Sequence, residues 1–408
     1  MTLWRLAFRN VARNRRRSLL TGGVVVFGFA AFALAGGFMA QSLDGLREGT
    51  IRNGLGHLQL ADPAEFEGSG EGGAEHGLVD ASRIERILRR DPAVVEVLPR
   101  INFVGLVSAG LRSVPFLGVG LDPAPEARSM DYPEVLASGR WLAGRGERGV
   151  VLGVGLAKAL SVRDGDTVTM LATSADGVLN AVDAIVVGRV DLPVQELSER
   201  YLATSLDLAG ELLGATDRVS RLVVVLRSAG EASDALERAQ ERLRREGIRV
   251  SGKTWRELAV FYRQVRLLYL GIFGFMGIVL VIVVLLASAN TMLMAAAERT
   301  REIGTLRALG TRPGLIRRLF LLEGLCLAAS GCAGGVALSL VVRFALNHSG
   351  IVLPPPPGAA HGAPLHVQFF VAAHAAGAVV MFATLMLASY LPARRAASMS
   401  IVDALTHV

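Results

Sequence analysis

Four long apolar stretches constrain this chain more than any other feature. They occupy residues 19–40, 267–290, 319–342 and 369–390. A helix needs roughly 20 residues to cross about 30 Å of hydrocarbon, and each stretch is long enough. The chain is 51% hydrophobic over 408 residues, which is too apolar for an ordinary soluble enzyme. We therefore predict an α-helical membrane protein with four transmembrane helices.

The positions of the arginines predict the orientation of these helices. Six Arg and two Glu lie between residues 298 and 318, Arg394 and Arg395 follow the fourth stretch, and residues 344–366 contain no Lys or Arg. Because basic loops stay on the cytoplasmic side, both termini and the central loop are expected there. The net charge of +7 then reflects topology and lipid headgroups, and no nucleic-acid partner is expected.

The N-terminal segment has the pattern of an interfacial helix. An apolar stripe alternates with basic residues before the first span, which is typical of a helix lying on the inner leaflet. Ala33-Leu34-Ala35 resembles a signal-peptide cleavage site, but the apolar run is too long for a signal core, so we expect an uncleaved anchor. The expected segments outside the spans are residues 1–18 as this helix, 41–266 as an outer domain with stalk helices, 291–318 as a cytoplasmic loop, 343–368 as an outer loop and 391–408 as a cytoplasmic tail.

The sequence of the outer domain, residues 41–266, predicts an α+β fold. A helix is expected over residues 82–90 and another over 156–160, and an acidic, Gly-rich stretch at 62–77 predicts a mobile loop. Residues 221–226, a helix over 231–245 and residues 248–250 suggest a β–α–β unit, after which residues 254–266 are expected to continue as a helix into the second span. Further strands are predicted from β-branched content at residues 57–61, 94–98, 103–108, 115–120, 167–172 and 184–190.

Residues 247–254 match the phosphate-binding pattern G-x-x-x-x-G-K-[ST] letter for letter. In a P-loop a strand leads into the glycine turn and a helix N-terminus receives the phosphates. Here an amphipathic helix precedes Gly247, and the site would face away from cytoplasmic ATP. We interpret the match as a turn between a strand and the stalk helix. A membrane enzyme with a nucleotide site at Lys253 remains the rival interpretation.

Other candidate sites are weaker. His348, His361 and His366 share the outer loop but match no zinc spacing, so no metal site is expected. Glu323 and His374 are ionisable groups inside spans, close to an interface, for which snorkelling or a helix–helix hydrogen bond is the favoured role. Cys326 and Cys332 are six residues apart on one helix, which disfavours a disulfide bond. The third span carries a face of small residues suited to close helix packing, namely Ala328, Gly331, Gly334, Gly335 and Ala337.

The loop between the second and third spans contains a helix-like segment, Glu298 to Leu309. Gly310 and Pro313 predict its end. Ile303, Leu306 and Leu309 recur every three residues and are expected to share a face, while the charged residues lie mostly elsewhere. A basic loop required by topology explains part of this pattern. The alternative is a short surface helix offered to a cytoplasmic partner. Its candidate residues are Glu298, Arg299, Arg301, Glu302, Ile303, Gly304, Leu306, Arg307, Leu309 and Gly310.

The motif ERTREIGTLRALG, ending at Gly310, strongly resembles the FtsX-like, MacB-type permease family of ABC transporters. The FLLEG start of the third span, residues 320–324, resembles the same family, as does the tail PARRAASMSIVDAL at 392–405. GVGLDP at 118–123 and the block at 149–166 agree with its outer domain. GHLQL at 56–60 is more similar to the lipoprotein-releasing, LolC/LolE-like branch than to the antibiotic-exporting one.

The resemblance implies a periplasmic core domain of the MacB type and a bacterial inner-membrane location. It implies two cytoplasmic ABC ATPase subunits on the central loop and a second permease copy or paralogue. ATP and magnesium would be bound by the ATPase, so this chain is expected to bind no cofactor and to be no enzyme. Stalk helices, here with Trp255 and Phe261, would transmit motion to the outer domain. Membrane lipid, a lipoprotein cargo and a periplasmic acceptor are further implied partners. MacB-like export and FtsX-like signalling to a cell-wall hydrolase remain alternatives.

Overall fold

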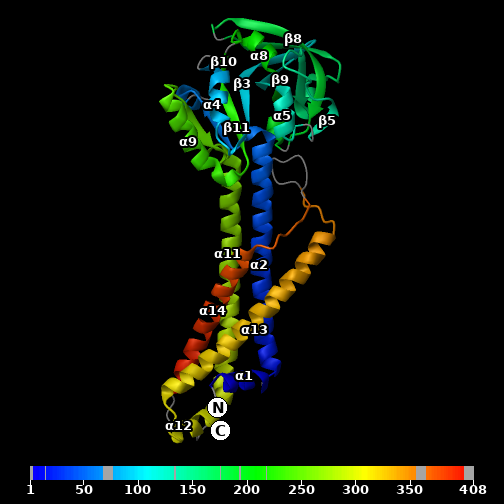
Figure 1. Cartoon of the computed structure of the whole chain (residues 1–408). Coiled ribbons are helices and arrows are strands. Elements are labelled where there is room, and N and C mark those ends of the chain that lie inside the picture. Colours follow the sequence, from blue (N-terminus) through cyan, green and yellow to red (C-terminus); the bar gives the residue numbers. More distant parts are fainter. Residues whose placement is uncertain are drawn as a thin grey trace. The chain divides into compact units, whose positions relative to one another are not determined.

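The structure is a computed structural model that describes residues 3–13, 15–67, 77–132, 135–174, 176–192, 194–216, 218–354 and 364–398 (Figure 1). The chain forms two compact units. The membrane unit comprises residues 1–44, 265–352 and 364–408, and the sheet unit comprises residues 45–264 and 353–363. Helices α2 and α11 each contribute residues to both units.

The membrane unit contains four helices, among the described residues, that are long and apolar enough to cross a membrane. Each of the four predicted stretches overlaps one of them, which confirms the predicted fold class. The helices of this unit are α1 (Leu3–Arg13), α2 (Arg15–Thr50), α11 (Val260–Glu298), α12 (Thr300–Ala308), α13 (Pro313–His348) and α14 (Val371–Ser398).

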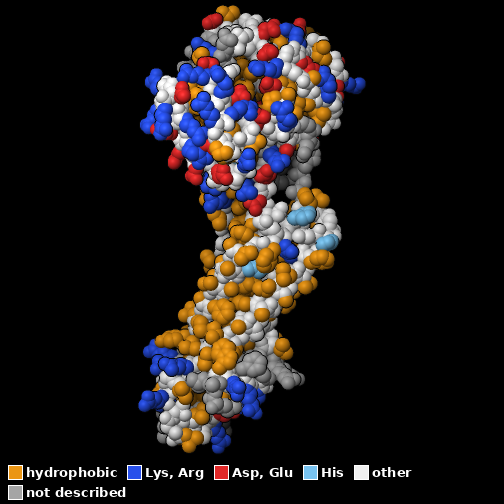
Figure 2. All heavy atoms as spheres, in the orientation of Figure 1, with side chains coloured by type: hydrophobic (Ala, Val, Ile, Leu, Met, Phe, Trp, Pro, Cys, Tyr) orange, Lys and Arg blue, Asp and Glu red, His pale blue; other side chains and the backbone are white. Residues whose placement is uncertain are grey.

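The predicted small-residue face of α13 packs against α2. A Cβ atom added at Gly331 would lie 2.6 Å from Val25, and one at Gly335 would lie 2.7 Å from Phe29, so both positions require glycine. This contact lets the two backbones approach closely, as small residues do between membrane helices. By contrast, α11 leaves large apolar side chains such as Leu267 and Phe275 exposed, and hydrophobic side chains dominate the visible face of the long helices (Figure 2).

The sheet unit is built on a ten-stranded mixed sheet. Its order is β12-β1-β11-β3-β4-β9-β6-β8-β5, with β7 paired to β3 and β8. The pairs β4–β9 and β6–β8 are parallel, and β2 with β10 forms a separate small sheet. The strands are β1 (Leu58–Ala61), β2 (Leu78–Val79), β3 (Val94–Ala109), β4 (Arg112–Leu121), β5 (Leu136–Gly139), β6 (Gly149–Gly153), β7 (Thr167–Thr173), β8 (Leu179–Val190), β9 (Tyr201–Ser205), β10 (Arg218–Val219), β11 (Arg221–Leu226) and β12 (Ser251–Thr254).

Two hydrophobic cores stabilise this sheet. The larger joins the strands to α4, α6, α8 and α9, with Ile84, Leu156, Leu212 and Leu243 fully buried. The smaller includes Tyr132 and other large side chains near β4, β6 and β9. The helices and helical turns of this unit are η1 (Ile51–Leu55), α3 (Pro63–Glu67), α4 (Ala81–Leu88), α5 (Pro123–Ser129), α6 (Val154–Leu160), α7 (Gln195–Ser198), α8 (Leu206–Leu213), η2 (Ala229–Glu231), α9 (Ala232–Arg245) and α10 (Trp255–Leu258).

Most predicted elements are present, with four corrections. Residues 94–98 and 103–108 belong to one continuous strand, β3. The strand after α9 is β12 and not residues 248–250, because Ile248 and Val250 pack against the core without pairing to a strand. The helix expected over 254–266 is interrupted at Ala259. Part of the loop predicted at 62–77 forms α3, and its residues 68–76 lie outside the described residues.

Candidate functional site

Helix α12 is separated from its neighbours by two backbone breaks. Arg299, at φ −105° and ψ 13°, ends the continuity with α11, and Gly310, at φ +88°, follows α12. Pro313 begins α13, as the stop signals predicted. Glu298 is therefore the last residue of α11 and not the first of the short helix. The Thr300 hydroxyl donates hydrogen bonds to the Ala296 and Ala297 carbonyls at 3.3 and 2.8 Å, which supports the break.

The predicted common face of Ile303, Leu306 and Leu309 is wrong, because Ile303 alone of the three is buried and Leu309 lies just past the end of α12. Ile303 is 5% exposed and packs in the chain's own core with Ile316 and Phe320. Leu306 is 43% exposed and Leu309 is 79% exposed. With about 100° of rotation per residue, positions six apart differ by roughly 120° around the helix, which explains the divergence. Gly304 is also buried, on the Ile303 side of this division.

A buried ion pair fixes the break at Arg299. Its guanidinium Nη1 donates to Glu323 Oε1 of α13 at 2.9 Å, and the two side chains are 11% and 6% exposed. The side-chain amide of Asn10, from α1, donates to the same oxygen at 2.7 Å. Arg299 Nη2 donates to the Asn10 backbone carbonyl at 3.5 Å. The role predicted for Glu323, a hydrogen bond between helices, is confirmed, and three elements meet at one carboxylate.

The outer surface of α12 is charged. Arg13 of α1 pairs with Glu302 at 3.0 Å, and the two side chains are 60% and 59% exposed. Glu298 and Arg301 are exposed, and Arg307 is half-buried. Basic side chains gather around α12 on the visible face (Figure 2). Leu306 and Leu309 thus lie among charged groups, a composition suited to a protein partner rather than to lipid.

In the sheet unit, both long helices begin or end at the same pair of strands. Helix α2 leads through η1 into β1, and β12 leads through α10 into α11; β1 and β12 are antiparallel partners, with Leu58 opposite Thr254. The backbone N–H of Trp255 donates to the His57 carbonyl at 3.0 Å. Trp255 is buried and its indole donates to the Ala229 carbonyl at 3.3 Å. Phe261, the second predicted stalk residue, is exposed on α11.

A buried ion pair that the sequence did not reveal holds η1, the helical turn that follows α2. Arg100 donates to Glu126 from Nε at 2.6 Å and from Nη2 at 2.8 Å. Its third nitrogen, Nη1, donates to the Gly54 carbonyl inside η1. Gly54 has φ +124°, a conformation that favours glycine. Burial raises the pKa of neighbouring Tyr132 above its usual range. The sequence signal that could have indicated this ion pair is a single Arg in a largely apolar strand.

The P-loop match has no P-loop geometry. Gly252 and Lys253 lie in the extended strand β12, with Lys253 opposite Gln59 of β1. The Lys253 ammonium lies 4.7 Å from the centre of the Phe66 ring. Gly247, at φ +75°, follows the end of α9 and does not begin a phosphate-binding turn. The interpretation as a nucleotide site is therefore not supported by the local backbone.

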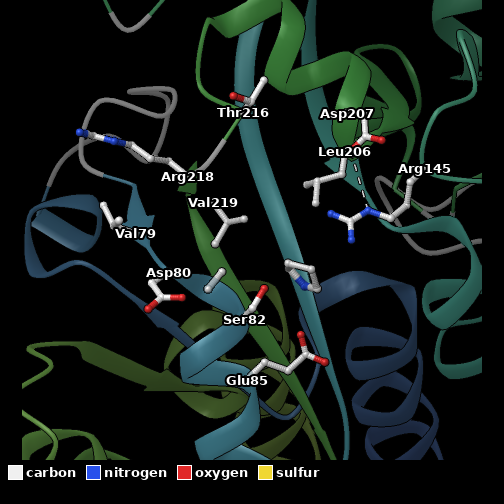
Figure 3. A pocket seen from close by; sticks show the side chains of 12 residues that line it. Val79, Asp80, Ser82, Glu85, Arg145, Leu206, Asp207, Thr216, Arg218 and Val219 are labelled. Atoms are coloured by element: carbon white, nitrogen blue, oxygen red, sulfur yellow. Dashed lines mark ion pairs between the residues drawn. The ribbon is translucent and has the colours of Figure 1, made fainter.

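One polar cavity of about 370 Å³ opens in the sheet unit (Figure 3). It lies between the start of α4, β10 and the start of α8. Arg145 points toward Asp207, 3.8 Å away, and Asp80 and Arg218 also line it. Among the described residues that line it there is no His or Cys, so these residues offer neither an imidazole base nor a thiol. Among the described residues no group of three or more His, Cys, Asp or Glu side chains is placed to hold a metal; His361 lies outside them.

The fold and site define a class: an integral membrane protein with four spans, a folded α+β domain and a short helix set between two spans. Residues 18–245 match the MacB-like periplasmic core domain, and residues 273–401 match the FtsX-like permease C-terminal model. The chain belongs to this family of FtsX-like permeases with a MacB-like periplasmic core domain.

Three relatives illustrate the similarity. The ABC transporter permease YtrF of Bacillus subtilis is 41% identical over 73 residues, 18% of this chain and 17% of its own. The lipoprotein-releasing system transmembrane protein LolE of Haemophilus influenzae is 24% identical over 275 residues, 65% of this chain and 64% of its own. The macrolide export ATP-binding/permease protein MacB of Salmonella paratyphi A is 34% identical over 116 residues, 28% of this chain and 16% of its own. The chain thus matches less than two thirds of each relative's length.

Proposed function

We propose that this chain is the permease subunit of an ABC transporter and couples ATP hydrolysis in a separate cytoplasmic ATPase to movement of its sheet domain. The observation that best supports this proposal is that the two sides of α12 have different environments. Ile303 fixes one side of the helix in the chain's core, while Leu306 and Leu309 remain exposed on another. A helix held from one side, with exposed apolar side chains among charged groups on the other, is suited to docking in a groove of a partner.

The proposed transmission uses the two long helices. A displacement of α12 acts on α11, which joins it through Arg299. At the other end, α2 leads into β1 and α11 follows β12, and these two strands are paired with each other. A relative movement of the two helices would therefore shear one strand pair in the sheet. The Arg100 contact to Gly54 fixes η1, the turn between α2 and β1, to that sheet, so movement is passed on rather than absorbed in a flexible turn.

The proposed topology places both termini and α12 in the cytoplasm and the sheet domain in the periplasm of a bacterial inner membrane. The Arg distribution supports it. Two ATPase subunits and a second permease copy or paralogue complete the proposed assembly. This chain contributes no ATPase site of its own under this proposal, and the extended backbone at Lys253 supports that part.

For the cargo we propose lipoproteins extracted from the inner membrane and passed to a periplasmic acceptor. The similarity to LolE, which extends over 65% of this chain, favours lipoprotein release. Export of drugs or peptides is the second candidate, favoured by the higher identity to MacB over a shorter segment. Signalling to a cell-wall hydrolase is a third, and the large sheet domain argues for transport instead.

Co-purification tests the proposal. The tagged chain is isolated with its ATPase, identified by mass spectrometry, and compared with Leu306→Asp and Glu302→Arg. We expect Leu306→Asp to release the ATPase and Glu302→Arg to keep it while hydrolysis no longer drives release. Wild-type behaviour of both variants contradicts the coupling function. Release of a labelled triacylated lipoprotein from proteoliposomes, with a macrolide efflux assay beside it, separates the two cargo classes.

A further inference from the structure

Helix α1 contacts the parts of the chain on which the proposed coupling depends. It packs along α13 with Ala7 fully buried, and it reaches α12 through side chains on its last turns. We propose that α1 is a strap that fixes the orientation of α12 against α13, with Asn10 as its positioning residue. This inference rests on the proposed function, because the strap matters for coupling only where α12 receives the ATPase.

Asn10 bonds to both members of the buried ion pair. Its side-chain amide donates to Glu323 at 2.7 Å, and its backbone carbonyl accepts from Arg299 at 3.5 Å. Hydrogen bonds to ionised groups are stronger than those between neutral groups. Loss of the Asn10 amide removes one of the two donors to the buried Glu323 carboxylate and leaves only Arg299. Asn10 therefore closes a ring of contacts that joins α1, the break before α12, and α13.

Arg13 adds a second contact, one turn further along α1. It pairs with Glu302, which lies on α12 itself, at 3.0 Å. An exposed ion pair contributes little to stability, but charges at an interface set orientation more than strength. The partly buried contacts through Asn10 thus hold α1 in place, and the Arg13–Glu302 pair sets the angle at which α12 is presented.

The strap has a mechanical consequence. Helix α1 ends at Arg13 and α2 begins at Arg15, so one residue separates them. Helix α12 is joined to α11 through Arg299. Both long helices therefore meet at α12, α11 through the chain and α2 through α1. A displacement of α12 therefore acts on both α2 and α11 instead of on α11 alone. This permits the two helices to move relative to each other.

A spin label on α12 tests the strap in the full-length chain. Thr305→Cys, an exposed position, is labelled in a background with both buried cysteines replaced by Ala. We expect Asn10→Ala to increase the mobility of this label. Arg13→Glu and Glu302→Arg should each increase it, and the Arg13→Glu/Glu302→Arg double variant should restore it. Arg9→Ala, an exposed arginine of the same helix, is the matched control and should behave as the parent.

The same variants are then measured in complex with the ATPase that co-purifies with the tagged parent. Asn10→Ala and Arg13→Glu, which lie outside α12, are expected to bind that ATPase with the parent's affinity, and Glu302→Arg is expected to remain bound. Asn10→Ala and the single charge reversals should lose the ATP-dependent change in label mobility, and the double reversal should regain it. If Asn10→Ala does not fold, the charge reversals, at exposed positions, still decide the question.

The outcomes separate the strap from the proposed function. Equal label mobility in all variants, or no rescue by the double reversal, overturns the strap whether or not the ATPase binds. Increased mobility with an unchanged ATP response overturns its positioning role. Failure of the parent to bind any ATPase overturns the proposed function, and with it the coupling role of α1, while the mobility data still report the contacts themselves.

Discussion

Replacing Leu309 by Ala should weaken ATPase binding without disturbing the permease. Leu309 is 79% exposed, so most of its side chain is available for burial by a partner. Full burial of a Leu side chain is worth about 1.5–3 kcal/mol, and roughly three quarters of it about 1–2 kcal/mol. Because every 1.4 kcal/mol is a factor of ten, the Kd should rise about 5- to 30-fold. Leu306, already more than half covered at 43% exposure, should contribute about half as much.

The assay is a titration of the purified ATPase into the permease in nanodiscs, with thermal unfolding of each variant alone. Two controls separate docking from folding. Leu111→Ala removes a fully exposed Leu in the sheet unit and should leave the Kd unchanged. Ile303→Val trims the side chain buried in the chain's own core; it should lower the free energy of unfolding by about 0.5–1.5 kcal/mol and leave the Kd unchanged. An unchanged Kd for Leu309→Ala, or a larger loss for Ile303→Val, refutes the assignment of sides.

Three further predictions concern the buried pair, the root of the stalk and the topology. Glu323→Leu leaves Arg299 buried without its carboxylate and should cost about 3–5 kcal/mol of stability in detergent, whereas Arg299→Met/Glu323→Leu should recover much of it; equal losses would contradict the pairing. Burial lowers the pKa of His57, whose Nδ1 accepts from Leu226 N–H, so stability should be complete above the unfolded value of about 6.5 and fall as pH drops below it. His57→Asn, which keeps an acceptor but does not titrate, should flatten that pH dependence of the unfolding midpoint. If the slope is unaltered, the pH dependence comes from another group. Leu111→Cys should react with a membrane-impermeant maleimide in intact spheroplasts and Thr311→Cys only after permeabilisation; labelling of Thr311→Cys without permeabilisation would reverse the proposed orientation.

The membrane helices were predictable because the requirement for them is local. A run of about 20 apolar residues has few other fates, and glycines such as Gly331 mark close packing by their spacing alone. Strands were predictable where β-branched residues cluster, as the three consecutive valines do in β11. The strands β5, β6 and β9 were missed because they are short, and their pairing depends on partners distant in the chain. The strand predicted at residues 248–250 was wrong because Ile248 and Val250 pack against the core without pairing to another strand. Such a segment has the same apolar pattern as a strand.

In the candidate site, too, the features set by neighbouring residues were predictable and those set by distant residues were not. Gly310 and Pro313 ended α12 as predicted, since capping depends on neighbouring residues. The assignment of Ile303 failed because a spacing of three drifts around the helix, and only the packing on Phe320 decides which side is buried. No local pattern shows that Arg13 meets Glu302, 289 residues away, or that Arg100 meets Glu126 across two elements. Such contacts follow from the tertiary fold, and they carry most of the proposed coupling.

The central claim, that α12 passes ATPase motion to the stalk, is tested most directly by a distance within the sheet unit. Spin labels at Glu48 near the end of α2 and at Phe261 near the start of α11, both exposed, report on the two stalk ends by double electron–electron resonance. In the assembled complex we expect the distance distribution to change between the nucleotide-free and vanadate-trapped states. Leu309→Asp should abolish that change and leave the nucleotide-free distribution as it was. A distribution that does not respond to nucleotide, or a response that persists in Leu309→Asp, contradicts the account.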